Sequence, residues 1–224
     1  MAYASINPYT GRLHKPFTHA TDDQIDQALA KSHDVFLVSK NQSFAGLSES
    51  LQRTTNLLKL EPSKFAQLLT LDMGENTSEA LGEVKILDRI IEFYANNTEA
   101  LLATKKLHVM DPSKGEAIIF QKPIGTILAT QLWNYPYYQV ARILAPQLTA
   151  GNNIQIGHLS NVPLYVLPFE DIFLEAGLLT VIYISIFTTH RQIETIINDD
   201  RVQSVALTSS VDAGSIIASQ AEKH

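Results

Sequence analysis

The sequence has 224 residues, of which 45% are hydrophobic and 18% charged, and its 17 Lys+Arg against 23 Asp+Glu give a formal net charge of -6. A chain this long and apolar can bury a core, so its composition excludes the disordered class. An acidic balance without a run of basic residues excludes the electrostatic footprint of a nucleic-acid-binding protein. Because the sequence contains no cysteine, these residues can form no disulfide, thiolate metal site or thiol nucleophile.

The N-terminus gives no targeting signal, because no basic segment is followed there by an apolar one. A cytoplasmic location is therefore the expectation. The longest apolar stretch, residues 176–187, is shorter than the roughly 20 residues that a membrane span needs. We interpret this stretch as core and expect no membrane partner.

The first half of the chain predicts a layer of four helices. Thr21 and Gln24 fit a capping box that opens the first helix, and a second helix is expected over residues 47–60. The third helix is predicted to open at Pro62 and to stop at Gly74. A long fourth helix follows Asn76, with apolar residues on one face.

The second half alternates short β-branched segments with helical ones, which is the pattern of parallel strands joined by crossover helices. A hairpin precedes the sheet, with strands expected at residues 106–110 and 117–120 and a turn at residues 111–115. Strands are predicted at residues 126–130, 153–156, 181–187 and 202–207. Helices are predicted between and after them, around residues 140–144 and over residues 162–176, 191–197 and 211–222.

This order predicts an α/β fold, a doubly wound, Rossmann-like parallel sheet with an N-terminal helical layer. Such sheets bind ligands beyond the carboxyl ends of their strands. The loops after Thr130, Ile156, Phe187 and Leu207 are therefore the places where we expect the chemistry.

Most charged clusters and all seven histidines have ordinary explanations. The histidines lack metal-ligand spacing, and we expect no metal site. Asp199 and Asp200 precede Arg201 in a turn, where carboxylates usually cap or are solvated. Glu83 and Asp88 are expected either on a solvated helix face or in an interhelical ion pair.

Three turns carry residues suited to ligand binding. In the segment 131–136, the Asn134 amide could face an oxyanion while Pro136 fixes the turn, although a buried aromatic turn explains the segment equally well. The loop 150–153 and the pair Ser209-Ser210 offer small residues where backbone could approach a phosphate at a helix N-terminus.

Several segments occur in the order seen in the aldehyde dehydrogenase superfamily. They are Asn7-Pro8-Tyr9-Thr10-Gly11, Asp72-Met73-Gly74, Pro123-Ile124-Gly125-Thr126-Ile127, Trp133-Asn134-Tyr135-Pro136, Ala150-Gly151-Asn152 and Val205-Ala206-Leu207-Thr208. On these segments the chain resembles that superfamily over nearly its whole length, and resembles most its bacterial succinate-semialdehyde dehydrogenases. Members oxidise an aldehyde to an acid with NAD or NADP, using a cysteine nucleophile and a general-base glutamate.

The resemblance implies roles for five residues. Asn134 corresponds to the side-chain donor of the oxyanion hole, and Trp133 lies beside the cofactor phosphates. Ser210 and Gly214 correspond to the serine and second glycine of a Gly-Ser-x-x-x-Gly segment at the pyrophosphate. Ser160 stands where NAD-selective members carry a glutamate, so both NAD and NADP are expected cofactors.

Departures from the family pattern imply weak or absent cofactor binding. Gly157 stands where the family has the lysine that holds the adenosine ribose. Ser209 replaces the first glycine of Gly-Ser-x-x-x-Gly and places a Cβ near the phosphate. Asp212 adds a negative charge at the same helix start.

By this resemblance, the chain is expected to be the cofactor-binding half of the enzyme, truncated before the catalytic domain and inactive alone. The expected parts are a helical part (1–104), a hairpin (105–122) and a nucleotide-binding part (123–224). The strand at residues 202–207 would be an unprotected edge. The alternatives are an assembly module, forming a homo-oligomer or pairing with a full-length paralogue through the hairpin at residues 111–115, and a reading frame without function.

Overall fold

A computed structural model of the chain describes residues 3–131, 134–158, 163–179 and 182–222. It opens with an antiparallel hairpin of β1 (Tyr3–Ile6) and β2 (Leu13–Phe17), which the sequence analysis did not predict. The β2 sequence Leu-His-Lys-Pro-Phe contains no β-branched residue and includes a proline, so it does not show the pattern of a strand. The buried Asp72 carboxylate, on α3, fastens this hairpin by accepting hydrogen bonds from the Ser5 hydroxyl and from the Leu164 amide, the latter at 2.6 Å.

The four predicted N-terminal helices are present, and their local signals are confirmed. They are α1 (Asp22–Ser39), α2 (Phe44–Leu60), α3 (Pro62–Met73) and α4 (Thr77–Leu102). Thr21 and Gln24 form the capping box of α1. Gly74 ends α3 in a left-handed conformation, φ 72°, and the Asn76 side chain caps α4.

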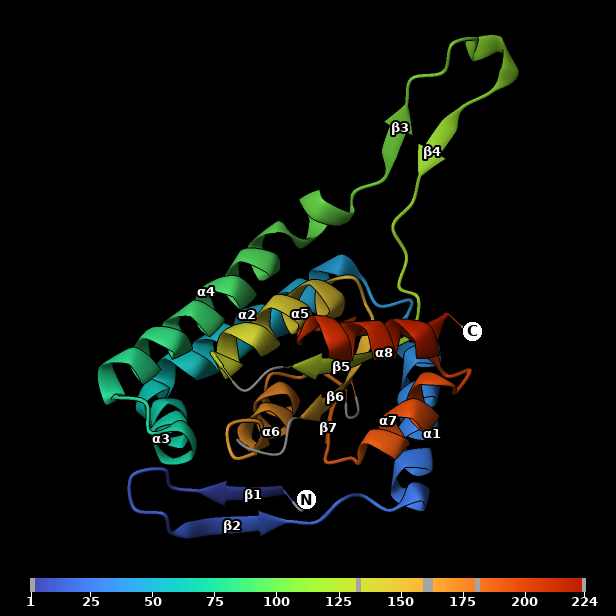
Figure 1. Cartoon of the computed structure of the whole chain (residues 1–224). Coiled ribbons are helices and arrows are strands. Elements are labelled where there is room, and N and C mark those ends of the chain that lie inside the picture. Colours follow the sequence, from blue (N-terminus) through green and yellow to red (C-terminus); the bar gives the residue numbers. More distant parts are fainter. Residues whose placement is uncertain (1–2, 132–133, 159–162, 180–181, 223–224) are drawn as a thin grey trace.

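The predicted hairpin is also present, with shorter strands than expected. β3 (Lys105–Leu107) pairs antiparallel with β4 (Ala117–Ile119), and a short 3-10 helix η1 (Pro112–Lys114) lies in the turn. Figure 1 shows this hairpin projecting from the body of the molecule beyond the end of α4. Its strands are largely exposed, which agrees with their projection from the body.

The second half forms the predicted parallel sheet. Its strands are β5 (Thr126–Gln131), β6 (Asn153–His158), β7 (Tyr183–Ile186) and β8 (Val202–Leu207), in the spatial order β7-β6-β5-β8. All three neighbouring pairs are parallel. The connecting and following helices are α5 (Pro136–Thr149), α6 (Leu167–Glu175), α7 (His190–Ile197) and α8 (Val211–Ala221). The predicted edge position of β8 is confirmed within the described strands.

One of these helices begins later than predicted. The sequence analysis expected a helix over residues 162–176, but α6 starts at Leu167, with Pro168 in its first turn. Proline lacks an N–H and is compatible with a helix mainly in its first turn, so Pro168 favours a start at this point.

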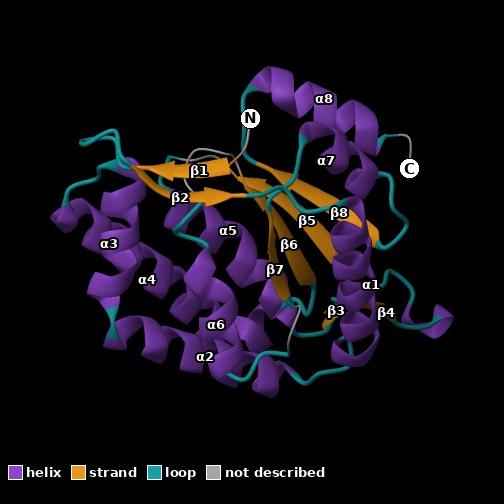
Figure 2. Ribbon diagram, turned by 90° about the horizontal axis from the view of Figure 1, so that it is seen from below, coloured by secondary structure: helices purple, strands orange, loops and turns teal. Residues whose placement is uncertain are grey.

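Helices cover both faces of the sheet and bury two main apolar clusters. The larger cluster joins α2, α3, α4, α5 and α6 to one face. The smaller cluster joins α1 and α7 to the other face, through Ile25, Leu29 and Ile196 against Leu128 of β5. Figure 2 shows this division, with α1, α7 and α8 on the side opposite α5 and α6. The predicted N-terminal helices are all present, with α2, α3 and α4 on one face of the sheet and α1 on the other.

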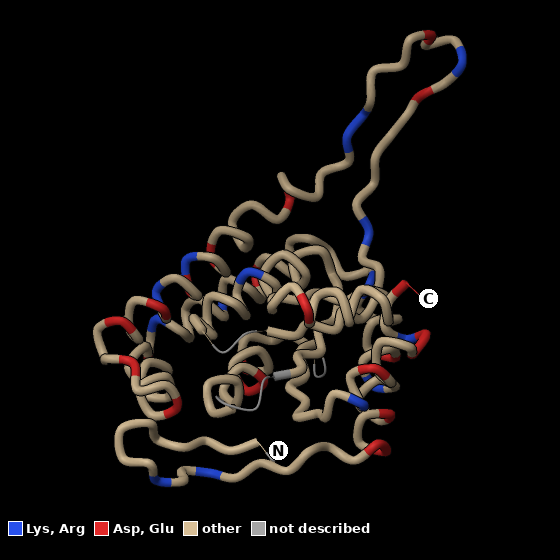
Figure 3. The backbone as a smooth tube through the Cα atoms, in the orientation of Figure 1, with Lys and Arg blue, Asp and Glu red and all other residues tan. Residues whose placement is uncertain are grey.

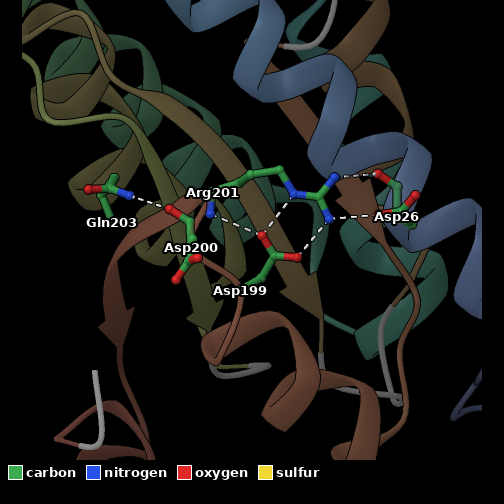
Figure 4. Close-up of polar contacts among 5 residues, drawn as sticks. All are labelled: Asp26, Asp199, Asp200, Arg201 and Gln203. Carbon is green, nitrogen blue, oxygen red and sulfur yellow. Dashed lines mark hydrogen bonds and ion pairs between the residues drawn. The ribbon is translucent and has the colours of Figure 1, made fainter.

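An ion-pair network fastens α1 to the turn before β8. The Arg201 guanidinium contacts both carboxylate oxygens of Asp199, at 2.8 and 2.6 Å, and the Asp26 carboxylate of α1 at 2.7 Å (Figure 4). The Asp199 carboxylate also accepts from the Arg201 amide. Asp199 thus has the predicted capping role, and Arg201 links two elements far apart in sequence.

Candidate functional site

The sheet reverses its winding between β5 and β8. The chain runs from β5 through β6 to β7 and then returns to place β8 on the other side of β5. The amide of Thr208 donates to the carbonyl of Thr130 at 3.0 Å, so the segments leaving both strands stay together. Ligands of doubly wound sheets bind at such a switch point, which makes this edge the candidate site.

The turn after β5 holds Asn134 at this edge. Asn134 is exposed, and the next residue, Tyr135, has a left-handed backbone with φ 50° before Pro136 opens α5. Asn134 and Tyr135 line an open pocket of about 310 Å³ together with Met73, Gly74 and Glu75. Exposure of Asn134 agrees with the ligand-facing interpretation of this turn.

Glu83 of α4 forms hydrogen bonds with the first turn of α5. One oxygen of its carboxyl group accepts from the amides of Tyr137, at 2.5 Å, and Tyr138, at 3.1 Å. The residue is 2% exposed. The predicted solvated face is therefore wrong for Glu83, because its helix neighbours pack against α5. Asp88 confirms the other alternative, since it lies 3.6 Å from Lys59 of α2 in an interhelical ion pair.

Burial raises the pKa of Glu83 to about 7, and the nearby Glu75 carboxylate adds to the shift, while the two amides oppose it. The pKa of Glu75 is also raised, first by burial and then by Glu79. Figure 3 shows acidic positions gathered where α3 leads into α4. The Asn134 pocket thus has the Glu75 carboxyl group in its lining, and both Glu75 and the buried Glu83 hold their protons more strongly than in water.

The turn after β8 leads into the N-terminus of α8. Ser210 is the N-cap, its hydroxyl accepting from the Ala213 amide at 3.3 Å, and it is exposed. A Cβ added to Gly214 would meet no atom within 4 Å, so the surface over this first turn is open. An open helix N-terminus with a serine hydroxyl fits a phosphate group.

The end of β6 offers a poorer fit to a nucleotide. A Cβ on Gly157 would lie 3.0 Å from the Cδ1 methyl of Ile193, on α7. The hydroxyls of Thr130 and Thr188 lie 3.8 and 3.9 Å from the same point. The space beside Gly157 is therefore occupied by Ile193, and the residues at this edge fit the phosphate end of a dinucleotide better than its ribose.

Arg142 is a candidate that the sequence analysis missed. It is exposed on α5, its guanidinium carbon lies 5.8 Å from the centroid of the Tyr138 ring, and within the described residues it forms no ion pair. Since helical side chains tilt toward the N-terminus, this cation lies over the preceding turn of α5, on the side of the helix start that Asn134 precedes. The signal was available in the sequence, because Arg142 is the single charged residue of α5.

Other predicted residues lie elsewhere. Trp133 and Ser160 fall outside the described residues. The loop 150–153 follows the C-terminus of α5 and precedes β6, so it lies at the amino edge of the sheet. The predicted phosphate-binding role of this loop is wrong. The side-chain oxygen Oδ1 of Asn152 instead accepts hydrogen bonds from the amides of Ile124 and Gly125, which lead into β5.

The part of the chain that the structure describes has neither a membrane-spanning helix nor a cluster of metal ligands. No helix there is long and apolar enough to cross a bilayer. No three His, Asp or Glu side chains of those residues gather as metal ligands do.

Comparison with known proteins places the whole chain in one group. The family model described as "Aldehyde dehydrogenase family" matches residues 1–224. Succinate-semialdehyde dehydrogenase [NADP(+)] 1 of Mycobacterium bovis is 36% identical over 214 residues, which are 96% of this chain and 47% of that protein. The enzyme of the same name from Mycobacterium ulcerans is 34% identical over 215 residues, with the same two coverages.

A solved structure has the same fold. The crystal structure of succinic semialdehyde dehydrogenase from Streptococcus pyogenes, in complex with NADP+, matches with a TM-score of 0.95 and 32% identity, over 99% of this chain and 48% of that one. The chain thus spans about half the length of the relatives it matches.

Proposed function

This chain belongs to the aldehyde dehydrogenase family, and we propose that it forms the nucleotide-binding part of an NAD(P)-dependent enzyme of the succinate-semialdehyde type. One observation carries the proposal. At the switch point between β5 and β8, an exposed amide side chain and an open helix N-terminus lie on segments joined by a backbone hydrogen bond. Such a pairing suits a carbonyl compound next to a phosphate-bearing cofactor.

In this proposal Ser210 and the turn around Gly214 hold the pyrophosphate, with Trp133 beside it and Ser160 near the ribose. Asn134 donates its amide N–H to the oxygen of the reacting carbonyl as negative charge develops there. Bound NAD or NADP would supply the hydride acceptor. Because Ser160 carries no charge, no carboxylate at that position would repel a 2′-phosphate, and NADP is accepted as well as NAD.

The position of Arg142 favours a substrate that carries a carboxylate at the end opposite its aldehyde group. Arg142 lies six residues after Pro136, which is ~9 Å along the axis of α5, and its guanidinium lies over the Tyr138 ring, one turn nearer to the start of the helix. A guanidinium pairs well with a carboxylate. We therefore propose that Arg142 selects aldehyde acids such as succinate semialdehyde.

The 224 residues contain no cysteine, which bears on turnover. The family reaction, as the resemblance implies it, needs a thiolate nucleophile and a general-base glutamate. We propose that a polypeptide of these residues alone binds nucleotide weakly and does not oxidise aldehyde.

The test is calorimetric titration of the purified chain with NAD and NADP, with thermal unfolding in parallel. A ligand that binds only the folded state raises its melting temperature by mass action. We expect dissociation constants of about 1 mM or tighter, near −4 kcal/mol. A cooperatively folded chain that binds neither nucleotide contradicts the proposal.

Ser210→Asp is the matched variant. Aspartate caps a helix as well as serine does and suits the positive end of the dipole, so α8 stays intact. Its negative charge repels phosphate, and we expect nucleotide binding to be lost while the melting temperature is kept. If this variant binds nucleotide as tightly as wild type, α8 does not form part of the nucleotide site.

A second candidate function, assembly, rests on the hairpin. Leu107, Ile118, Ile119 and Phe120 are 40–63% exposed, and the projecting strands carry them away from the body (Figure 1). Exposed apolar side chains on a projecting element are typical of an interaction surface. On this view residues 105–122 pair the chain with another copy or a full-length paralogue, and residues 1–104 and 123–224 form its supporting body.

Light scattering after size-exclusion chromatography distinguishes the two. If the hairpin assembles copies of the chain, Phe120→Ser lowers the molar mass without changing the melting temperature, whereas Ser210→Asp leaves the mass unchanged. A monomeric wild-type chain that does not associate with a full-length paralogue contradicts the assembly function.

A further inference from the structure

The start of α5 is a backbone segment that its own residues do not stabilise. Tyr135, its N-cap, makes no side-chain capping bond and has φ 50°, a conformation unfavourable for a residue with a Cβ. Pro136 has no N–H, so the first amides that need partners are those of Tyr137 and Tyr138. Asn134 immediately precedes this segment, and its placement depends on it.

Glu83 supplies the missing cap from another helix. Both amides donate to the same carboxyl oxygen of Glu83, which is 54 and 55 residues away in sequence. The other oxygen is buried and has no partner in the described residues. A carboxylate at a helix N-terminus interacts favourably with the helix dipole, and the low exposure of Glu83 strengthens that interaction.

The groups facing Glu83 come from three elements. Glu75, after α3, is the neighbouring carboxyl group, and the phenols of Tyr137, on α5, and Tyr165, before α6, also face it. No lysine or arginine of the described residues forms an ion pair with Glu83. The amides of α5 are therefore what holds its carboxylate.

We propose that Glu83 is a positioning residue of the aldehyde site, holding the start of α5 so that Asn134 presents its amide to the reacting oxygen. The inference rests on the proposed function, since it takes Asn134 as the oxyanion donor. The inference rests on geometry, because one buried oxygen of Glu83 accepts hydrogen bonds from the amides of Tyr137 and Tyr138, which closely follow Asn134. A strained backbone, such as that of Tyr135, persists only where neighbouring groups hold it. Glu83 is the group of α4 that does so here.

Protonation of Glu83 would then change the position of the Asn134 side chain. The charged carboxylate accepts stronger hydrogen bonds than the neutral acid does. The raised pKa of Glu83 places this change in the neutral range. Loss of the charge weakens both bonds without removing the acceptor, so the turn relaxes but does not unfold.

The experiment uses the full chain labelled with ¹⁵N, and follows the Tyr137 and Tyr138 amides and the Asn134 side-chain amide from pH 5.5 to 8.5. We compare wild type with Glu83→Gln, Glu83→Ala and Glu79→Gln. Glu79→Gln is the matched control, because it makes the same chemical change one turn earlier at an exposed position. In wild type and in this control the three signals are expected to titrate together with a midpoint near 7.

In Glu83→Gln the signals should stay close to their wild-type positions but no longer titrate, because glutamine keeps the acceptor and loses the charge. In Glu83→Ala the Asn134 signal should shift, and the Tyr138 amide should exchange with solvent at least about tenfold faster. An Asn134 signal that neither titrates in wild type nor moves in the folded variants overturns the proposal. A titration that persists in Glu83→Gln overturns it too, and this variant decides the matter if Glu83→Ala does not fold.

Failure of the proposed function has a different signature. If the chain binds no nucleotide but Asn134 still titrates through Glu83, the positioning contact stands and the enzymatic role of Asn134 falls. If nucleotide binds and Asn134 is insensitive to Glu83, the family function stands and the positioning role falls.

Discussion

Two buried carboxyl groups, Asp72 and Glu83, each serve as acceptors for backbone amides of distant segments. Burial raises the pKa of both, and hydrogen bonds from the amides offset only part of that shift. Removing a carboxylate from water costs free energy that these contacts do not fully return. At the scale of single residues, burying these two carboxyl groups thus costs stability at the places where α3 and α4 contact distant segments of the chain.

The pH dependence of unfolding follows for Glu83. Its folded pKa, about 7, lies above the unfolded value of 4.5, so between these values the folded state binds more protons than the unfolded state. Its contribution to the free energy of unfolding is fully present below pH 4.5 and is lost as pH rises to about 7. Glu83→Gln removes this titration, and we expect its stability relative to wild type to rise by on the order of 2 kcal/mol between pH 4.5 and 8.

Urea unfolding at both pH values measures the difference. Glu79→Gln again serves as the control, and its stability relative to wild type should change little with pH. A pH-independent gap between Glu83→Gln and wild type would mean that Glu83 keeps one protonation state over the whole range.

Asp212 is the residue at which stability and binding are expected to oppose each other. It lies in the first turn of α8, where a negative charge favours the helix but repels a phosphate. Asp212→Asn is therefore expected to tighten NADP binding by about twofold to fivefold and to lower the melting temperature. Calorimetry measures the NADP affinity and thermal unfolding measures the melting temperature of the same sample. An Asp212→Asn variant with both a lower NADP affinity and a lower melting temperature contradicts the phosphate site.

Arg142 gives a prediction on substrate class. Arg142→Gln should weaken the binding of succinate semialdehyde, followed through the Asn134 side-chain signal, by about tenfold, the order expected for one charged hydrogen bond. Butanal has the same chain length without the carboxylate and is the control, and its binding should change less than twofold. An equal effect on both aldehydes would indicate that Arg142 acts through packing on Tyr138.

Between elements, an ion pair connects α1 with the turn before β8, 175 residues away in sequence. Arg201 lies between Asp26 and Asp199, and its side chain is 26% exposed. A double-mutant cycle of Arg201→Ala and Asp26→Ala should give a coupling energy of about 0.5–1 kcal/mol that decreases in 1 M salt.

The control for that cycle is the pair of Lys114 and Asp111 in the hairpin turn, whose side chains are 81% and 47% exposed. This pair should show no measurable coupling. If the Arg201 cycle also gave no measurable coupling energy, the ion pair would be a consequence of the packing between α1 and the sheet and would not stabilise that packing.

For the whole molecule, the helices α2 to α4 and one face of the sheet share a single core. Leu87 of α4 is fully buried in it. Leu87→Ala should lower the free energy of unfolding by about 2–5 kcal/mol, and far-UV and near-UV circular dichroism should report one coincident transition. Phe93→Ala, on the exposed side of the same helix, should cost little, and separate transitions would show that the helices and sheet fold independently.

Sequence patterns predicted what depends on neighbouring residues in the chain. The capping box at Thr21, the left-handed stop at Gly74 and the four β-branched strands follow from backbone preferences and from the period of apolar residues, which act over a few positions. The order of strands and helices then predicted the parallel sheet and the edge where Asn134 and Ser210 lie. The resemblance to a family supplied their roles.

Contacts between distant segments decided the rest. No local pattern shows that Glu83, in an ordinary helical position, ends against the start of α5, or that α1 crosses to the other face of the sheet. The same holds for Ile193, which occupies the space beside Gly157. Local propensity and periodicity determined the elements of this protein, whereas its site depends on burial and charge contributed across 50 or more residues, which only the packed tertiary structure brings together.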